Sequence, residues 1–600
     1  MADKFMSMRN LKFTLHEVVG NAPLPHATGG NGHTRKSMDM VLDAAFDFAK
    51  KALHPIFEEM DRNPPELKDG TVAVHKDVRR IMTTLGKDGW ISAVFPEEWG
   101  GENMPASLLH AVNFIFASAN YSGSVYSGLT MGAATLILTF GTDELKQAFL
   151  PPMLEGKWQG TMALTEPEAG TSLGDIATSA TPAGDGTYRI SGEKIFISAG
   201  DHDGVDNVVH LMLARIDGAP AGVKGISLFV VPKLRSDGNG GLVGNDVTVT
   251  QVFHKLGYRG APITALSIGE KGDCTGYLVG EANRGLSYMF QMMNGARLEV
   301  GMGATAISTA AYHAALDYAR NRKQGRRLTD GKGAPPIAII EHQDVKRMLL
   351  FQRAVSEGAL SLILQCSRYE DLIHAGPEDQ RDDYHLLLEL LTPVAKTFPS
   401  EMGILSTSLS IQCFGGYGYC EDFPVEQHFR DMRIHTIHEG TTGIQGMDLL
   451  GRKVVMKNGK ALMLLDQEMN KTIEKAQAYP ELQEMAKKLS DAKGTLASTT
   501  QALGGMAMEK GPEAFLANAT LYLEMFGHVT IAWQWLAQAM VASEKLAAKS
   551  VKKSDQAFYE GKLAVGRYYF IHELPKIAPL AGTLTQPPVT LETSVAHFTD

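Results

Sequence analysis

The spacing of apolar residues changes twice along this 600-residue chain, and this change constrains the fold more than any other feature. Residues 38–160 carry helical spacing, as at Val41 and Ala45. From Thr161 onward, short runs rich in Val, Ile and Phe alternate with Gly, Asp, Asn and Pro turns, which is typical of strands. Helical spacing returns after Gly285. The order predicts a helical domain, a small β-domain and a second helical region.

The domain boundaries follow from these changes, because a chain of this length with 44% hydrophobic content is too long for one core. The predicted divisions are an irregular N-terminal arm (1–37), an N-terminal helical domain (38–160), a middle β-domain (161–285), a C-terminal helical bundle (286–456) and a C-terminal helical extension with a tail (457–600). Within the bundle, Pro393 and Pro399 are expected to interrupt the helices.

Composition excludes several classes of protein. The net charge of -10 disfavours nucleic acid and anionic membrane as partners. The four cysteines have no C-x-x-C spacing, so neither a disulfide framework nor a metal site is predicted. The N-terminus lacks the apolar core of a signal peptide, and no apolar run approaches the length of a bilayer. We expect a cytoplasmic protein with no transmembrane segment.

One carboxylate in the C-terminal third has the surroundings of a general base. Glu439 lies between His438 and Gly440, after an aromatic and glycine-rich stretch that begins at Phe414. Partial desolvation should raise its pKa toward the range in which a carboxylate takes a proton from carbon. From these residues alone, a helix N-terminal acid favoured by the helix dipole remains an alternative.

Four short motifs around this carboxylate, F-G-G-x-G-Y, R-D-x-R-I, I-x-E-G-T and I-Q, resemble in their order the C-terminal signature of the acyl-CoA dehydrogenase flavoproteins. The resemblance implies that Glu439 removes the pro-R α-proton of an acyl-CoA thioester while the β-hydrogen leaves as hydride to flavin N5. It places Gly440 at the substrate and Thr441 at the FAD. One subgroup of the family carries its glutamate at the position of Ala296, which this chain cannot use as a base.

Two segments of the middle domain resemble the family's flavin-binding motifs. The first is similar to T-E-P-x-A-G-S and implies FAD contacts from Thr165 and Thr171. The second is similar to G-x-K-x-W-I-T/S-N-G and implies contacts from Phe196 and Ser198. Here the chain departs from the pattern, because Phe196 replaces the usual tryptophan and Ala199 the asparagine. The resemblance still implies an aromatic ring over the flavin, but phenylalanine lacks the N–H donor of the tryptophan indole.

The basic end of the long helix after Gly285 has two possible interpretations. On the residues alone it is a solvated helix end. The family resemblance instead implies that Arg322 pairs with the FAD diphosphate of a neighbouring subunit, which a guanidinium fork suits, and that Arg297 braces the acyl-CoA. The further FAD contacts that it implies are Gln343, Phe414, Gly415 and Gly416. A homodimer or homotetramer is therefore expected.

The resemblance implies an α+β multidomain protein with the acyl-CoA dehydrogenase fold, namely an N-terminal helical domain, a β-barrel-like middle domain and a C-terminal four-helix bundle. The added helical extension is similar to that of larger members, including the 3-methylmercaptopropionyl-CoA dehydrogenase group. The implied function is FAD-dependent formation of trans-2-enoyl-CoA in fatty-acid β-oxidation, with electrons passed to electron-transfer flavoprotein. The alternatives are an acyl-CoA oxidase that uses oxygen, and a nonenzymatic scaffold or DNA-associated relative. Net acidity and the intact Glu439 oppose the DNA-associated alternative.

Overall fold

The computed structural model describes residues 4–20, 33–331, 333–548 and 551–599. These residues form two units: residues 1–43, 106–114 and 297–600 belong to the first, and residues 44–105 and 115–296 to the second. The division falls inside three helices, α2 (Arg35–Phe48), α5 (Ala106–Ala119) and α8 (Gly285–Asn321).

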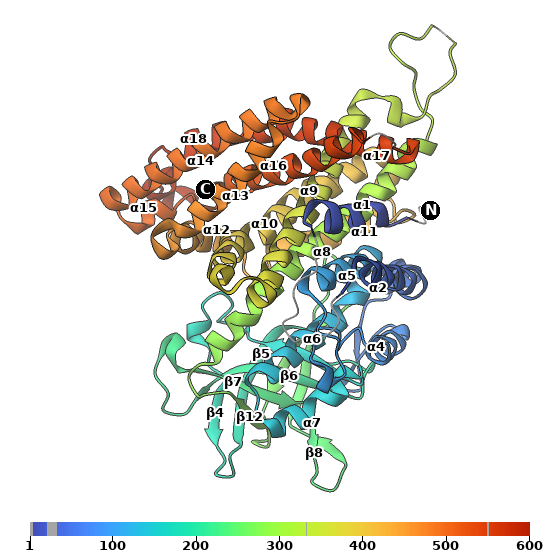
Figure 1. The fold of residues 1–600 in the computed structure, drawn as a ribbon. Helices are drawn as coiled ribbons and strands as arrows, with labels where there is room; N and C mark the ends of the chain where they lie inside the picture. The colour runs from blue at the N-terminus through green and yellow to red at the C-terminus, as the bar shows by residue number, and fades with distance from the viewer. Residues whose placement is uncertain (1–3, 21–32, 332, 549–550, 600) are drawn as a thin grey trace. The chain divides into compact units, whose positions relative to one another are not determined.

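A mixed sheet forms the centre of the second unit, and Figure 1 labels several of its strands. The strand order is β10-β11-β5-β12-β7-β6-β3, with β4 paired to β5 and β6. The β3–β6 and β4–β6 pairs are parallel and the other pairs antiparallel. Ile190, Phe229 and Leu266 belong to its fully buried core. The sheet confirms the strand-rich middle domain of the predicted fold. Its strands are β3 (Trp158–Ala163), β4 (Ser179–Pro182), β5 (Tyr188–Ser198), β6 (Asn207–Ile216), β7 (Ile226–Pro232), β10 (Val247–Val252), β11 (Ile263–Ile268) and β12 (Thr275–Val279).

Helices and two small hairpins complete the second unit. The helices are α3 (Phe57–Arg62), α4 (Asp77–Lys87), α6 (Tyr121–Phe140) and α7 (Asp143–Leu154), and the hairpins pair β1 (Glu66–Lys68) with β2 (Thr71–Ala73) and β8 (Leu234–Ser236) with β9 (Leu242–Gly244). Helix α7 begins at Thr142, whose hydroxyl caps the Leu145 N–H. Two acidic residues, Asp143 and Glu144, follow in its first turn, where the helix dipole favours them.

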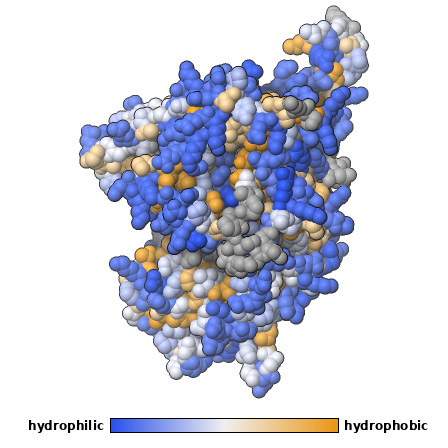
Figure 2. All heavy atoms as spheres, in the orientation of Figure 1, coloured by the Kyte–Doolittle hydropathy of each residue, from blue (hydrophilic) through white to orange (hydrophobic). Residues whose placement is uncertain are grey.

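Helix α6 is the one helix in the described part of the chain with the length and hydropathy of a membrane span. It packs against the sheet, because Gly160 of β3 has no side chain and its N–H donates to the Thr130 hydroxyl at 3.1 Å. Its Tyr126 hydroxyl donates to the Gly260 carbonyl at 2.9 Å. These bonds identify α6 as a core helix of its unit. The face in Figure 2 is mostly hydrophilic, with hydrophobic residues in small groups.

Long helices build the first unit. The bundle contains the C-terminal part of α8, α9 (Gln343–Ala375), α10 (Arg381–Phe414), α11 (Val425–Met432) and α12 (Thr442–Asp448). The extension, coloured orange to red in Figure 1, contains α13 (Lys460–Ala476), α14 (Gln483–Lys510), α15 (Pro512–Leu516), α16 (Ala519–Leu546), α17 (Lys553–Tyr568), α18 (Ile577–Leu584) and α19 (Val589–Glu592). Trp535 of α16 donates to the Ala354 carbonyl of α9 at 3.0 Å. The extension is thus packed on the bundle through buried groups.

Helix α10 corrects one expectation. It runs unbroken through Pro393 and Pro399, where interruptions were predicted. Each proline removes one backbone hydrogen bond, but the helix is buried on most sides and its packing compensates. Gly301 of α8 lies directly against the Ala395 carbonyl, which is the group that Pro399 leaves without its usual donor.

The N-terminal arm is the second correction. Residues Met8–Phe13 form α1 and Thr14–Val18 continue it as a π-helical turn, η1, so the prediction of an irregular arm is wrong there. Asn10 accepts a hydrogen bond from Lys562 of α17 at 2.6 Å, and Phe13 is fully buried. Residues 1–3 and 21–32 of the predicted arm lie outside the described residues.

Candidate functional site

Glu439 lies in a tight turn of the first unit, between η10 (Arg433–Thr436) and α12. Its φ angle is 52° and that of Gly440 is 87°, so two consecutive residues are left-handed. For a glutamate this conformation is strained, and strain of this kind clusters at functional sites. A Cβ on Gly440 would lie 2.7 Å from Nε2 of Gln445, so the turn requires glycine at that position.

Two side chains hold the carbonyl groups of this turn. Nε2 of Gln445 donates to the Glu439 carbonyl at 3.0 Å. Nζ of Lys396, on α10, donates to the Gly440 carbonyl at 2.9 Å. Both Gln445 and Lys396 are fully buried. The two consecutive peptide groups on either side of the Gly440 Cα are therefore held by donors from two different helices, α12 and α10.

The charge state of Glu439 fits the predicted general base. Burial raises the pKa of its carboxyl group above the ordinary value, and the positive charges of Arg297 and Lys396 oppose this rise without cancelling it. The predicted upward shift is confirmed. Arg297 is itself buried, and its Nη1 pairs with Oδ2 of Asp448 at 2.9 Å. The structure thus brings Arg297 into the electrostatic neighbourhood of Glu439.

The two histidines before Glu439 are not competing bases. The rings of His435 and His438 meet edge to face, with centroids 5.2 Å apart. Burial lowers the pKa of both imidazoles, that of His435 to about 4. Both are therefore neutral near pH 7, and their low pKa values make them poor proton acceptors. After the base, Thr441 caps α12 by accepting from the Ile444 N–H at 3.4 Å, and Thr442 donates to Glu401 of α10.

A second group of predicted residues gathers at the C-terminal end of α8, also in the first unit. The Arg322 carbonyl accepts from the Ile339 N–H at 2.8 Å, and its exposed side chain donates to Gln324 at 3.0 Å. One turn earlier, Tyr318 stacks on Phe414 with ring centroids 4.1 Å apart. The structure thus brings Arg322 and Phe414 together through one aromatic neighbour.

The glycines after Phe414 fit a cofactor that approaches the backbone. Gly415 ends α10 with a φ of 63°, and the space where a Cβ would stand at Gly415 or Gly416 is open. Gln343, the first residue of α9, is exposed. An exposed guanidinium, a side-chain amide and the backbone N–H groups of glycines can all donate hydrogen bonds to a diphosphate. These residues therefore fit the phosphate-bearing part of FAD.

The second unit holds the other predicted flavin residues on and beside β5. Thr165 accepts through its carbonyl from the Ile195 N–H at 2.9 Å, which places it beside Phe196. Phe196 is left-handed, with a φ of 56°, and 58% of its surface is exposed. Ser198 pairs with Ile263 of β11, and Thr171 lies exposed in the loop before η5 (Leu173–Asp175). An exposed aromatic ring with hydroxyl groups nearby fits the flavin ring.

A buried ion pair fixes the loop that carries Thr165 and Thr171. Nζ of Lys194 lies 2.7 Å from Oε1 of Glu166 and donates to the Leu164 carbonyl at 3.0 Å. The same carboxylate accepts from the Ala177 N–H at 2.6 Å and from Thr178. Burial would raise the pKa of Glu166, but Lys194 outweighs it and the pKa lies below the ordinary value.

Sequence reasoning missed the roles of Lys396, Gln445 and the Lys194–Glu166 pair. A signal for Lys396 was present, because it is one charge inside the apolar run Leu390–Phe398, and lysines are almost never buried without a partner. Lys194 directly precedes the apolar run Ile195–Ile197, but its strand also carries Arg189 and Glu193, so this signal is weaker. Neither signal names the carbonyl that the lysine bonds, since that partner is distant in sequence.

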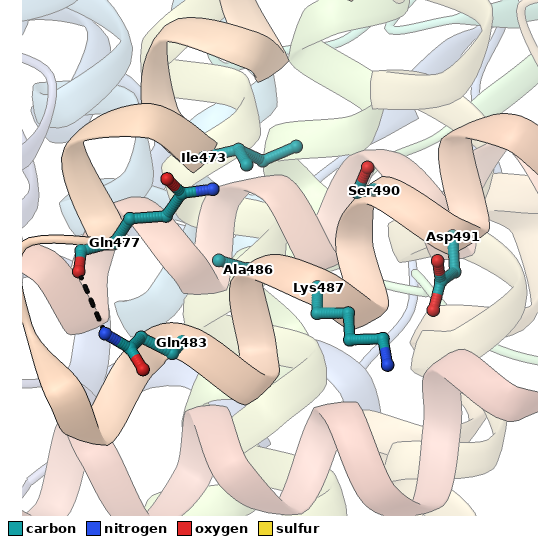
Figure 3. A pocket seen from close by; sticks show the side chains of 7 residues that line it. All are labelled: Ile473, Gln477, Gln483, Ala486, Lys487, Ser490 and Asp491. Carbon is teal, nitrogen blue, oxygen red and sulfur yellow. Dashed lines mark hydrogen bonds between the residues drawn. The ribbon is translucent and has the colours of Figure 1, made fainter.

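Figure 3 shows a pocket elsewhere, in the extension between α13 and α14. Its volume is about 510 Å³, and Nε2 of Gln483 donates across its rim to the Gln477 carbonyl at 3.3 Å. The residues that line it are Ile473, Gln477, Gln483, Ala486, Lys487, Ser490 and Asp491. None of the predicted site residues is among them.

Comparison with known families covers almost the whole chain. Residues 35–157 match the model described as acyl-CoA dehydrogenase, N-terminal domain, and residues 161–270 the model for the middle domain. Residues 283–454 match the acyl-CoA dehydrogenase C-terminal domain. Residues 465–592, in the extension, match a model described as acetyl-CoA dehydrogenase C-terminal like.

Individual relatives match over similar lengths. The chain is 38% identical to 3-methylmercaptopropionyl-CoA dehydrogenase of Ruegeria pomeroyi, over 86% of this chain and 87% of that protein. It is 33% identical to a butyryl-CoA dehydrogenase of Syntrophomonas wolfei, over 95% of each. A solved acyl-CoA dehydrogenase from Bacillus anthracis, complexed with FAD, superposes with a TM-score of 0.74 at 20% identity, covering 94% of this chain and 89% of that one. These similarities extend through the bundle and the extension.

Proposed function

Because the chain belongs to the acyl-CoA dehydrogenase family, we propose that Glu439 is the base that removes the α-proton of an acyl-CoA thioester, giving trans-2-enoyl-CoA. The observation that carries the proposal is the desolvated carboxylate of Glu439, with its raised pKa, in a left-handed turn held on both sides. The Cα–H bond breaks, its electron pair stays on carbon, and the proton goes to the carboxylate. A raised pKa makes that transfer more favourable at neutral pH.

The acyl-CoA dehydrogenases are FAD-dependent oxidoreductases, and this chain, as a member of the family, is a FAD-dependent oxidoreductase as well. When bound, FAD supplies the acceptor for the β-hydrogen, which leaves as hydride. For the contacts, we propose the hydroxyl residues Thr165, Thr171, Ser198 and Thr441, the aromatic residues Phe196 and Phe414, and Arg322, Gln343, Gly415 and Gly416. Arg297 and Gly440 are proposed for the substrate.

The thioester carbonyl must be polarised before its α-proton becomes acidic. In the described part of the chain, no hydrogen-bond acceptor is found for the Glu439 N–H. We propose that this N–H donates to the thioester oxygen. The same residue therefore supplies both the base and a donor to the developing negative charge.

For the substrate we propose a short acyl chain, since both relatives above are named for short acyl groups, 3-methylmercaptopropionyl and butyryl. Electron-transfer flavoprotein is the proposed acceptor and the cytoplasm the proposed location. Anaerobic flavin bleaching by a panel of acyl-CoAs tests the chain length, and fast peroxide release under air would instead indicate an oxidase. We also propose a homodimer or homotetramer, because the exposed Arg322 is assigned to a neighbour's FAD. A yellow, active monomer in sedimentation would contradict this assembly.

The variant Glu439→Gln tests the base directly. It keeps the size of the side chain but cannot accept the proton, so anaerobic flavin reduction should fall roughly 10²- to 10⁴-fold. Acyl-CoA should still bind, as measured by the perturbation of the flavin spectrum.

The matched control is Glu524→Gln. Glu524 is a half-buried glutamate in the extension whose pKa burial also raises, and its change should leave the rate unaltered. Reduction of the folded, yellow Glu439→Gln variant within a few-fold of the parent rate would remove Glu439 from this role.

A further inference from the structure

Lys396 is a buried cation with an unusual set of partners. Its side chain has no exposed surface, and its Nζ donates to the Gly440 carbonyl. Among the described residues, no carboxylate lies within ion-pair distance of Nζ. Burying an ammonium without a paired anion is costly, so Lys396 does not resemble a residue kept only for stability.

The groups that face this ammonium come from three elements. Glu439 in the turn and Glu401 on α10 favour its charged form, whereas Arg297 on α8 disfavours it. The imidazoles of His435 and His438 are also close enough to interact electrostatically with the ammonium, and both imidazoles are neutral. Lys396 in turn lowers the pKa of Glu439, against the effect of burial. Lys396 and Glu439 are therefore coupled through space as well as through the Gly440 carbonyl.

We infer that Lys396 is a positioning residue for proton transfer, one that acts through Gly440 and Glu439 and does not touch the substrate. It holds the carbonyl on one side of the left-handed turn while Gln445 holds the carbonyl on the other. The inference rests on the function proposed above. Without this bond the strained turn can relax, and an error of about 1 Å in the position of a base costs on the order of a hundredfold in rate.

Two substitutions separate the hydrogen bond from the charge. Lys396→Met removes both, whereas Lys396→Gln keeps an N–H donor for the Gly440 carbonyl and removes the charge. Anaerobic flavin bleaching by butyryl-CoA is measured from acid to alkaline pH. Lys396→Met should reduce the maximal rate roughly ten- to a hundredfold, and Lys396→Gln by less. In both, the acid limb of the profile should move to higher pH, because the cation that lowers the pKa of Glu439 is absent.

The control is Lys562→Met. Lys562 is also fully buried, on α17, where it bonds to Asn10, Glu357 and Gln538. Its loss should reduce thermal stability and leave the acid limb in place. This contrast distinguishes an effect on Glu439 from the general cost of losing a buried lysine.

The outcomes are distinct from failure of the proposed function. If the parent protein is not bleached by any acyl-CoA, the proposed function fails before Lys396 is tested. If the parent is bleached and both Lys396 variants keep its acid limb and maximal rate, the inference is overturned. If neither variant folds, Lys396 stabilises the bundle and the positioning role is likewise rejected.

Discussion

Two buried lysines, one in each unit, hold the backbone of a loop with site residues, and they do so differently. Lys194 and Lys396 have no exposed surface, and burial lowers the pKa of each to about 8. Lys194 also pairs with Glu166 at 2.7 Å, so both charges are neutralised. Lys396 bonds a neutral carbonyl, and the carboxylate that it influences, Glu439, lies outside ion-pair distance.

The difference separates a structural pair from a pair that can do chemistry. The pKa of Glu166 is held below the ordinary value, so this carboxylate stays ionised. The pKa of Glu439 is raised by burial, so this carboxylate is a better proton acceptor than an exposed one. A lysine paired directly with Glu439 would lower the pKa of this carboxyl group and weaken the base. The comparison therefore teaches that incomplete pairing is what keeps Glu439 usable.

The largest expected effect is on stability in the second unit. Lys194→Met leaves Glu166 buried without its cation, which should lower the free energy of unfolding by roughly 3–5 kcal/mol. Lys396→Met leaves only a carbonyl without its donor and should cost about 1–3 kcal/mol. Urea unfolding of both variants, followed by circular dichroism, measures the difference. Equal losses in the free energy of unfolding would show that the two lysines stabilise the protein equally, although only one of them has an ion pair.

The next effect concerns FAD and the exposed residues of the first unit. Arg322→Ala removes a charge-assisted contact worth roughly 1.5–3 kcal/mol, so FAD affinity should fall about ten- to a hundredfold. The variant should purify partly colourless and regain colour on added FAD. The control is Arg320→Ala, which changes an exposed arginine two residues earlier, in the last turn of α8, and should retain FAD. Full occupancy of Arg322→Ala after dialysis would leave Arg322 as a solvated helix end.

The smallest effect is on the pH dependence of stability, to which the carboxylates of Glu166 and Glu439 contribute with opposite sign. The lowered pKa of Glu166 contributes stability above pH 4.5, which is lost as the pH falls below that value. The raised pKa of Glu439 means that the folded state binds more protons above pH 4.5, so stability falls as the pH rises through that window. Glu439→Gln should therefore be roughly 0.5–2 kcal/mol more stable than the parent at pH 7, and Glu166→Gln less stable. Thermal melts from pH 2 to 7 check both signs, and a destabilised Glu439→Gln would contradict the argument.

Much of the fold followed from local pattern. The sheet between two helical regions was predictable, because strand and helix spacing differ and the turns are rich in Gly and Pro. The N-terminal helix was not, since Leu11, Phe13 and Leu15 are all buried and alternate like a strand. With six residues α1 is shorter than two helical turns, so its sequence shows too little of the helical period. The unbroken α10 also escaped prediction, because packing and not propensity decides the fate of its two prolines.

The same distinction between local sequence pattern and tertiary packing applies to the candidate site. Glu439 could be identified from neighbouring residues in one short stretch, and its raised pKa followed from the apolar surroundings. Lys396 could not be assigned, because its bond to Gly440 joins residues 44 positions apart. The Glu166–Lys194 pair spans 28 positions and was hidden for the same reason. Short motifs thus suggest the proposed base, whereas the groups that hold its backbone are determined by tertiary structure.

The contact between the two ends of the first unit has a consequence for synthesis. Asn10 and Lys562 bond at 2.6 Å although 552 positions separate them. At a typical rate of 5–20 residues per second, the ribosome needs on the order of 30–110 s to reach the second residue after the first. During that interval the α1 segment, with the hydrophobic side chain of Phe13, lacks its final binding partner. The α1 segment therefore reaches its native contacts only after most of the residues that follow it have been synthesised.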